Sequence, residues 1–341
     1  MHQIKKTHRA KGLNMPKIIV IGLGSAINIA KNIVENSTAT PHLRGLDISV
    51  KHIDTSHKSE TPDIPLLIVG DGLGSGGRKV ARFNDFKVQK NQIDSFLEVG
   101  KEPTMYVICT GTAGGTSAGL NIILDSLKME SKLMVVAENH STAQARKNTY
   151  KTLQGLINWS KKNGSLPIFN IDNDNQSYAV VNKWISNEVG LLLSFFTTNM
   201  RTIDFNDMLN FMRPDSLIDE EAEAFRNLPY KFETHLDYIE ESENVYLARE
   251  VVTSPDSDLI GQEEEIGGDF NKQGHFSAKV DCITDEGTSA EKVILTQTPN
   301  YWQKYIRNIK ATVAKDEQNK MAVIDFDDDG EDGDADSGTV L

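Results

Sequence analysis

The stretch Cys109-Thr-Gly-Thr-Ala-Gly-Gly-Thr-Ser-Ala-Gly119 determines how the rest of this sequence is interpreted. It follows an apolar run at 105–108, typical of a strand buried on both faces, and precedes a segment at 120–128 with apolar residues at helical spacing. Glycines at such a junction let backbone N–H groups approach an anion, and the helix N-terminus adds partial positive charge. Further donors are the hydroxyls of Thr110, Thr112, Thr116 and Ser117. The stretch therefore predicts a phosphate-binding loop.

The pattern around this loop alternates strands with helices. Buried strands are expected at 17–21, 46–53, 65–69, 105–108, 133–136 and 167–171, with helices at 27–34, 93–99, 120–128 and 143–161. Such alternation is typical of an α/β fold with a doubly wound parallel sheet. Ligands in these sheets bind outside the carboxyl ends of the strands, where the glycine-rich and polar loops of this sequence fall.

The length of 341 residues allows a second domain beside the predicted sheet. The expected segments are an N-terminal arm (1–16), a nucleotide-binding domain (17–175), a long central helix (176–200), a smaller α/β domain (201–297), a C-terminal helix (298–324) and an acidic tail (325–341). The central helix is apolar nearly all round its second half, so we expect it to lie between two layers. Strand-like runs at 244–252, 276–283 and 292–298 indicate the smaller domain.

Composition and charge exclude several classes of protein. The formal net charge is −13, and eight of the carboxylates are Asp325, Asp327, Asp328, Asp329, Glu331, Asp332, Asp334 and Asp336. The tail is therefore predicted to be disordered, and the mildly acidic remainder argues against direct nucleic-acid binding. The longest apolar run, 189–196, is too short to span a bilayer. Segment 1–11 is basic without a following apolar region, so it is not a signal peptide, and we expect a cytoplasmic protein with Cys109 and Cys282 reduced.

Three loops at the predicted ligand edge contain glycine, at 22–26, 70–77 and 110–119. One such loop is a common tight turn, but three on one edge favour phosphate binding, because each glycine costs folding entropy. A polyphosphate also suggests Mg²⁺, which prefers phosphate oxygens and water with one carboxylate or none. The local carboxylates are Asp71 and Asp54, although aspartates in loops also act as simple turn formers.

Two common nucleotide motifs are missing. No GxxxxGK[ST] sequence occurs, and the stretch Gly22-Leu-Gly24-Ser-Ala-Ile27 lacks the third glycine of the dinucleotide fingerprint. An NAD(P)-dependent oxidoreductase that uses 22–26 alone remains an alternative of a different class. It leaves the loops at 70–77 and 110–119 without a role.

The motifs in order resemble those of the tubulin/FtsZ superfamily. Ala113-Gly-Gly-Thr-Ser-Ala-Gly119 is similar to its signature loop, with Ser117 where a glycine is usual. Gly72-Leu-Gly-Ser-Gly76 resembles the Gly-Leu-Gly-Ala-Gly loop of FtsZ that reaches the γ-phosphate, and Ile203-Asp-Phe-Asn-Asp207 resembles Val-Asp-Phe-Ala-Asp after the long helix of FtsZ. Thr202 replaces the Asn that FtsZ carries just before it. The resemblance covers about 17–213.

The resemblance implies a GTPase whose active site is split between subunits of a head-to-tail polymer. Asp204 and Asp207 of one subunit would complete hydrolysis of the nucleotide on the next, where positioning and electrostatics supply most of the catalysis. Taken alone, these aspartates would be read as helix caps. The implied ligands are GTP or GDP with Mg²⁺, and Asp71 is the predicted metal ligand.

The same resemblance implies a set of nucleotide contacts. The implied phosphate contacts are Gly22, Gly24, Ser25, Gly72, Gly74, Ser75, Gly76, Gly111, Ala113, Gly114, Gly115, Thr116, Ser117 and Gly119. Glu138 and Arg146 would contact the ribose, although surface salt bridges explain them as well. Asn173 and Asn182 would contact the base.

A helix running straight into an acidic tail resembles the tubulins encoded by large bacteriophages more than FtsZ. In those proteins the tail helps to bind the neighbouring subunit along the filament, whereas a simpler interpretation is a solubilising tail. The resemblance thus predicts a filament that positions phage DNA or a replication compartment in the cytoplasm of a bacterial host, with the polymer itself as partner and phage cargo as a possible one. The alternatives within the family are a plasmid-segregation protein, a cell-division protein and a structural homologue without hydrolysis.

Overall fold

The computed structural model describes most of the predicted sheet and its helices. The described residues are 17–39, 47–75, 79–100, 104–164, 166–172, 176–194, 230–233, 247–253, 279–280, 291–297 and 299–327. The predicted N-terminal arm, the predicted catalytic residues Asp204 and Asp207, and the predicted acidic tail from 328 lie outside these residues. None of the helices within them is long and apolar enough to cross a membrane.

Six parallel strands form the part of the sheet that carries the ligand edge. In spatial order they are β3 (Leu66–Ile68), β2 (Asp47–Asp54), β1 (Lys17–Leu23), β4 (Thr104–Gly111), β5 (Ser131–Glu138) and β6 (Pro167–Asp172). The direction of winding reverses between β1 and β4, which pair from Lys17 with Thr104 to Leu23 with Thr110. The order is that of doubly wound nucleotide-binding sheets, so the predicted fold class is confirmed for these strands.

The central strands are apolar along most of their length because helices cover both faces of the sheet. In β1 the residues Ile18 to Ile21 are fully buried, as are Met105 to Cys109 in β4 and Leu133 to Val136 in β5. Cys109 is a buried free thiol, and burial raises its pKa. This packing fixes the position of each loop at the carboxyl ends of the strands.

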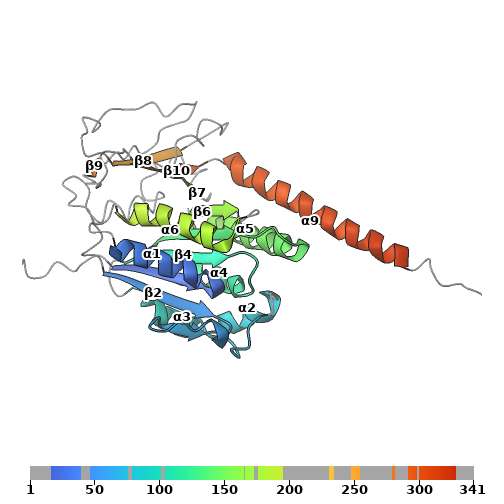
Figure 1. Cartoon of the computed structure of the whole chain (residues 1–341), viewed down its shortest axis with the longest axis horizontal. Coiled ribbons are helices and arrows are strands. Elements are labelled where there is room, and N and C mark those ends of the chain that lie inside the picture. The colour runs from blue at the N-terminus through green and yellow to red at the C-terminus, as the bar shows by residue number, and fades with distance from the viewer. Residues whose placement is uncertain are drawn as a thin grey trace, which may run out of the picture.

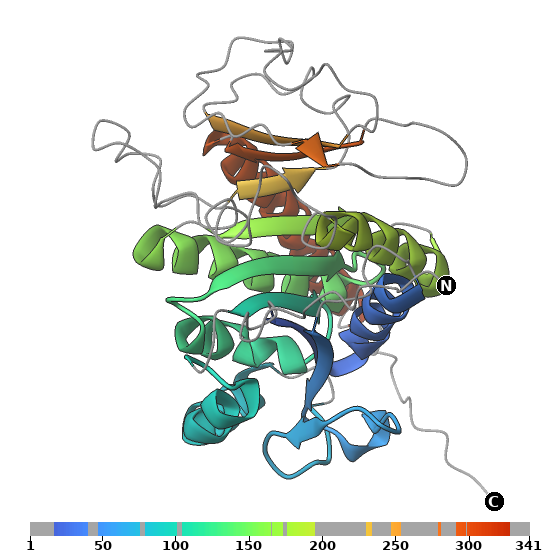
Figure 2. The same ribbon diagram turned by 90° about the vertical axis from the view of Figure 1, so that its left-hand side faces the viewer.

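Two layers of helices enclose the sheet, as Figure 2 shows. On one face α1 (Ile27–Ala39) packs against α6 (Tyr178–Ser194). The helices of the other face are α2 (Lys79–Val88), α3 (Lys90–Leu97), α4 (Leu120–Ser126) and α5 (Ala143–Asn163). The long helix α9 (Pro299–Asp327) lies along α5 and extends away from the body (Figure 1), and its Trp302, Ile309 and Val313 join the core.

Four further strands continue the same sheet beyond β6. They are β7 (Tyr230–Glu233), β10 (Glu291–Gln297), β8 (Leu247–Thr253) and β9 (Lys279–Val280), in that spatial order. Strand β10 runs antiparallel to both β7 and β8. Strands near 244–252 and 292–298 were expected from the sequence, whereas β7 was not. A separate second domain stays a prediction.

Two helices differ from the sequence-based expectation. The sequence analysis assigned no helix at 79–88, where α2 is only weakly apolar and its buried side, with Phe86, is short. Helix α9 continues to Asp327, so residues 325–327, predicted as part of a disordered tail, are helical. No glycine or proline interrupts the chain between Pro299 and Gly330, which lets the helix extend.

Candidate nucleotide site

A cavity of about 400 Å³ lies at the carboxyl ends of β1, β4 and β5, where the winding reverses. This is the position at which doubly wound sheets bind ligands, and the volume suits a small organic molecule. The lining comes from the start of α1, the loop after β4, the end of β5 and the start of α6. Its residues are Ser25, Ala26, Asn28, Ile29, Gly111, Thr112, Ala113, Gly114, Ala137, Glu138, Asn139, Tyr178 and Asn182.

The glycines after β4 open onto this cavity. A Cβ atom built on Gly111 or on Gly114 would have no other atom within 4 Å. The missing side chains therefore leave space beside the main chain, where a ligand can approach the backbone amides closely. This open backbone is the feature that makes the loop suitable for binding a phosphate group.

Neighbouring elements hold the open loop in place. Thr112 donates its N–H to the Ala137 carbonyl at 3.0 Å, and the Thr112 and Thr149 hydroxyls lie 2.6 Å apart. The Asn148 side-chain amide donates to the carbonyl of Ala113 at 2.9 Å. These bonds connect the loop to β5 and α5.

A buried polar network joins the loop after β1 to the loop after β4. The Asp54 carboxylate, at the end of β2, accepts hydrogen bonds from the Thr116 hydroxyl at 2.8 Å and from the Thr55 N–H at 2.6 Å. His52 Nε2 lies 3.1 Å from the carbonyl oxygen of Gly24. Burial lowers the pKa of His52, which favours a neutral imidazole that donates to this carbonyl. The carboxylate is thus occupied in bringing together two loops.

Solved structures resemble this arrangement over nearly the whole chain. A protofilament of TubZ from bacteriophage PhiKZ matches with a TM-score of 0.66 at 12% identity, covering 95% of each chain. The phage tubulin PhuZ with GDP matches with a TM-score of 0.65 at 14% identity, covering 90% of this chain and 92% of that one. The chain has the tubulin/FtsZ fold. A third match is CetZ2 from Haloferax volcanii, as a protofilament with GTPγS bound, with a TM-score of 0.60, 14% identity and coverage of 88% and 99%. At the level of sequence, neither a protein-family model nor a curated protein matches the chain.

Within the tubulin/FtsZ fold, six of the predicted contact residues line the cavity together. They are Ser25, Gly111, Ala113, Gly114, Glu138 and Asn182. Gly22 and Gly119 have packing roles, because a Cβ on Gly22 would lie 2.5 Å from Ile27 Cα and one on Gly119 would lie 2.1 Å from the Phe86 ring. Gly76, Asn173, Asp204 and Asp207 lie outside the described residues.

Asp71, the predicted metal ligand, is engaged in a local ion pair. Its carboxylate lies 2.8 Å from Arg82 Nη2 and accepts the N–H of Leu73 at 3.0 Å. The Leu73 N–H and the Arg82 guanidinium hold the pKa of this exposed carboxyl below its usual range. Among the residues that the structure describes, no three His, Cys, Asp or Glu side chains are grouped to hold a metal ion. The loop of Gly72, Gly74 and Ser75 is ordered by Arg82, which also donates to the Gly74 carbonyl at 2.6 Å.

The two residues predicted to contact the ribose have other partners. Glu138 lines the cavity but accepts hydrogen bonds from Tyr305, His140 and Asn170 at 2.7, 2.9 and 2.7 Å. Arg146 is not among the described residues that line the cavity. Its guanidinium forms a bidentate ion pair with the Asp316 carboxylate of α9, at 2.7 and 2.8 Å. The salt-bridge interpretation of Arg146 accounts for its position.

Six lining residues were not predicted from the sequence as ligand contacts: Ala26, Asn28, Ile29, Ala137, Asn139 and Tyr178. The Asn139 amide donates to the Tyr178 hydroxyl at 2.7 Å, so these two side chains form one wall of the cavity. Tyr178 is 63% exposed, which leaves an aromatic face available to a planar ligand. The available signal was an aromatic residue in the first turn of a helix that begins at the ligand edge.

Proposed function

We propose that this chain binds and hydrolyses GTP and polymerises head-to-tail into filaments. The observation that carries the proposal is the cavity where the direction of winding reverses, with the open backbone of Gly111 and Gly114. It lies in a chain with the tubulin/FtsZ fold. Backbone N–H groups of this loop would hold the phosphates, and Tyr178 and Asn182 would contact the base. The bound GDP and GTPγS and the protofilaments named in similar structures support the same activity.

The described carboxylates near the phosphate loops are already engaged, Asp54 with Thr116 and Asp71 with Arg82. Mg²⁺ would therefore be held by phosphate oxygens and water, a coordination that this ion accepts, and would neutralise phosphate charge. In the proposed filament, Asp204 and Asp207 of the next subunit supply the carboxylates that orient the attacking water. Hydrolysis then follows assembly, because neither subunit holds the whole site.

Light scattering and phosphate release, measured together, test this function. We expect assembly with GTP and with GTPγS, none with GDP, and disassembly after GTP is consumed. Asp204→Ala should retain GTP-dependent assembly and lose phosphate release, while Asp256→Ala, an aspartate with no predicted role, should retain both. Normal turnover in Asp204→Ala would exclude the split site. Absence of GTP binding would exclude the whole proposal.

The acidic tail is proposed to contact the neighbouring subunit along the filament. Because α9 ends at Asp327, truncation after this residue removes only the segment beyond the helix. We expect the truncation to raise the critical concentration for assembly sharply. A variant of full length with the acidic residues from 328 onward changed to Asn or Gln should do the same, since the contact depends on charge. Unchanged assembly in both would leave the tail with a solubilising role only.

The proposed biological role, by analogy with the phage tubulins of the same fold, is the positioning of phage DNA or a replication compartment in the cytoplasm of a bacterial host. Plasmid segregation and cell division are the alternatives for a filament of this kind. Fluorescent fusion of the chain, observed in infected and uninfected cells, separates them. A filament that centres DNA only during infection supports the phage role, and a ring at the division site contradicts it.

A further inference from the structure

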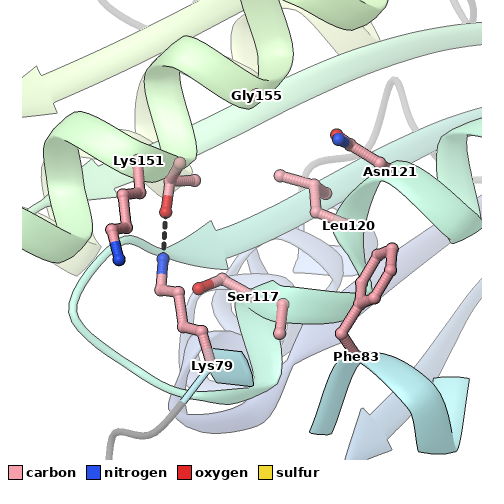
Figure 3. Close-up of a pocket in the computed structure, with 9 residues that line it drawn as sticks. Lys79, Phe83, Ser117, Leu120, Asn121, Lys151 and Gly155 are labelled. Carbon is pink, nitrogen blue, oxygen red and sulfur yellow. Dashed lines mark hydrogen bonds between the residues drawn. The ribbon is translucent and has the colours of Figure 1, made fainter. Parts of the chain in front are cut away.

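A second, smaller cavity of about 240 Å³ lies between α2, α4 and α5 (Figure 3). The loop that supplies Gly111 and Gly114 to the nucleotide cavity supplies Ser117 and Ala118 to this one. Figure 3 shows the ammonium groups of Lys79 and Lys151 and the hydroxyl of Ser117 toward one end, with Phe83 and Leu120 toward the other. Ser117 was predicted as a contact of the nucleotide phosphates but lines this cavity and not the nucleotide cavity.

The hydrogen bonds of Lys79 go to neutral acceptors. Its ammonium donates to the carbonyl of Asn148 at 3.1 Å and to the hydroxyl of Thr152. By contrast, Lys51 pairs with the Glu98 carboxylate at 2.6 Å. Within the described part of the chain, neither Lys79 nor Lys151 forms an ion pair with a carboxylate.

The absence of a counter-ion affects the protonation of Lys79. Burial, and to a lesser degree the positive charge of Lys151, lowers the pKa of Lys79 to about 7. Lysines that lose water usually gain a carboxylate partner, because an unpaired buried charge is costly. An anion in the cavity would supply this missing charge to both lysines at once.

We propose that this cavity is a binding site for a small oxyanion, with inorganic phosphate as its ligand, held by Lys79, Lys151 and Ser117. The volume lies below the roughly 300–1,000 Å³ typical of pockets for drug-sized molecules and has room for an ion with a few waters. Ammonium groups bind phosphate through charge-assisted hydrogen bonds, which are stronger than neutral ones. The site is separate from the cavity proposed to bind nucleotide.

The most direct link from the phosphate site to the nucleotide cavity is a hydrogen bond of Ser117. The Ser117 hydroxyl donates to the carbonyl of Gly114 at 2.7 Å. If a bound phosphate accepts the hydrogen bond of the Ser117 hydroxyl, the carbonyl of Gly114 loses its donor. Gly114 lines the nucleotide cavity. Phosphate at the second site therefore changes the affinity of the first for nucleotide, a coupling that rests on the proposed function.

Isothermal titration of the full chain, saturated with GDP, tests the site with inorganic phosphate and separately with sulfate. We expect one saturable site for each anion, weakened about tenfold or more by Lys79→Gln or by Lys151→Gln, since each removes a charged donor. Lys161→Gln, on the exposed side of the same helix α5, is the matched control and should bind as the wild type does. Lys151 is exposed, so its variant is expected to fold even if Lys79→Gln is unstable.

Wild-type affinity in both lysine variants, or no saturable site in the wild type, would overturn the proposal. Binding of a peptide of residues 328–341 with no binding of phosphate would overturn it too, and would assign the lysines to protein carboxylates. These measurements need no turnover. Loss of GTP hydrolysis with intact phosphate binding would contradict the proposed function alone, and the reverse result would contradict the phosphate site alone.

Ser117→Ala tests the coupling. In this variant phosphate should no longer change the affinity for GDP, whereas in the wild type it should shift that affinity measurably. An equal shift in both proteins would remove Ser117 from the link.

Discussion

The two cavities that share the loop after β4 differ in how each could hold an anion. The larger one presents open backbone at Gly111 and Gly114, and no lysine or arginine is among the described residues that line it. The smaller one presents two lysines. Backbone N–H groups are fixed and do not titrate, whereas a buried ammonium responds to pH and to its ligand. In the two proposed sites, one short loop would thus serve two kinds of anion, and charged side chains would not be needed at the first.

The glycines show a second contrast. Gly111 and Gly114 have empty space where a side chain would be, while the positions of Gly22 and Gly119 are filled by Ile27 and Phe86. The first pair leaves room for a ligand, and the second pair lets a strand or loop pack closely against its neighbour. Substitutions at the first kind of glycine should therefore reduce ligand affinity, and those at the second kind should reduce stability.

Filling the open space should have the largest effect. Gly111 ends β4 and has no left-handed backbone angle, so Gly111→Val is compatible with the strand. We expect the affinity for GTP to fall about a hundredfold or more, because the new methyl groups block charge-assisted hydrogen bonds worth about 1.5–3 kcal/mol each. Fluorescent nucleotide titration measures the loss. Thermal unfolding without nucleotide should match the wild type, and unchanged affinity would mean that the phosphates lie elsewhere.

Gly22→Ala should instead weaken the fold. Its Cβ would lie 2.5 Å from Ile27 Cα, a backbone atom that cannot move alone. We expect a loss of about 2–3 kcal/mol in the free energy of unfolding, the upper range for overpacking. Urea unfolding gives the value, with Gly111→Ala as the control that has space for its methyl group. Equal stability of the two variants would contradict the distinction between packed and open glycines.

The sequence predicted the sheet well because buried parallel strands produce continuous apolar runs. The segments at 17–21, 105–108 and 133–136 lie within β1, β4 and β5. Helix α2 was missed because it is mostly polar, and its tertiary contacts, including the packing of Phe86 against Gly119, are not visible in the sequence. The end of α9 was placed too early because a charged run was taken as the end of the helix.

The site was only partly predictable for a related reason. The sequence does not show whether a glycine borders open space or packs closely against a neighbour, so Gly111 and Gly22 could not be distinguished. Asp71 and Arg146 looked like ligand contacts because their partners, Arg82 and Asp316, are separated from them along the chain and are brought close only by folding.

The network that joins the two loops should give an intermediate effect. Asp54→Ala leaves the Thr116 hydroxyl and the Thr55 N–H without their acceptor. We expect a loss of about 2 kcal/mol in the free energy of unfolding, since each unsatisfied buried group costs about 1–3 kcal/mol. Asp54→Asn keeps an oxygen acceptor and should lose about half as much. The KM for GTP should rise in Asp54→Ala and recover in Asp54→Asn, and an unchanged KM in both would limit Asp54 to a structural role.

The smallest effect should come from the lysine cavity, and it depends on pH. The pKa of Lys79 is lowered to about 7 in the folded chain, against about 10.4 for a lysine in the unfolded chain. Between these values the unfolded state binds a proton that the folded state does not, so this residue makes stability rise with pH and leaves no slope below about pH 7. Lys79→Met removes the penalty, so its Tm should exceed that of the wild type at about pH 6 and converge with it toward about pH 10.

The control for this last variant is Lys161→Met on the exposed side of α5, which should show no difference that changes with pH. Sulfate keeps a constant charge over this range and should raise the Tm of the wild type but not of Lys79→Met, since ligands stabilise only the state that binds them. A pH-independent difference between the wild type and Lys79→Met would show that the ammonium is solvated and paired in solution. In that case the contrast between the two cavities would be one of shape alone, because neither would contain a charge that responds to its ligand.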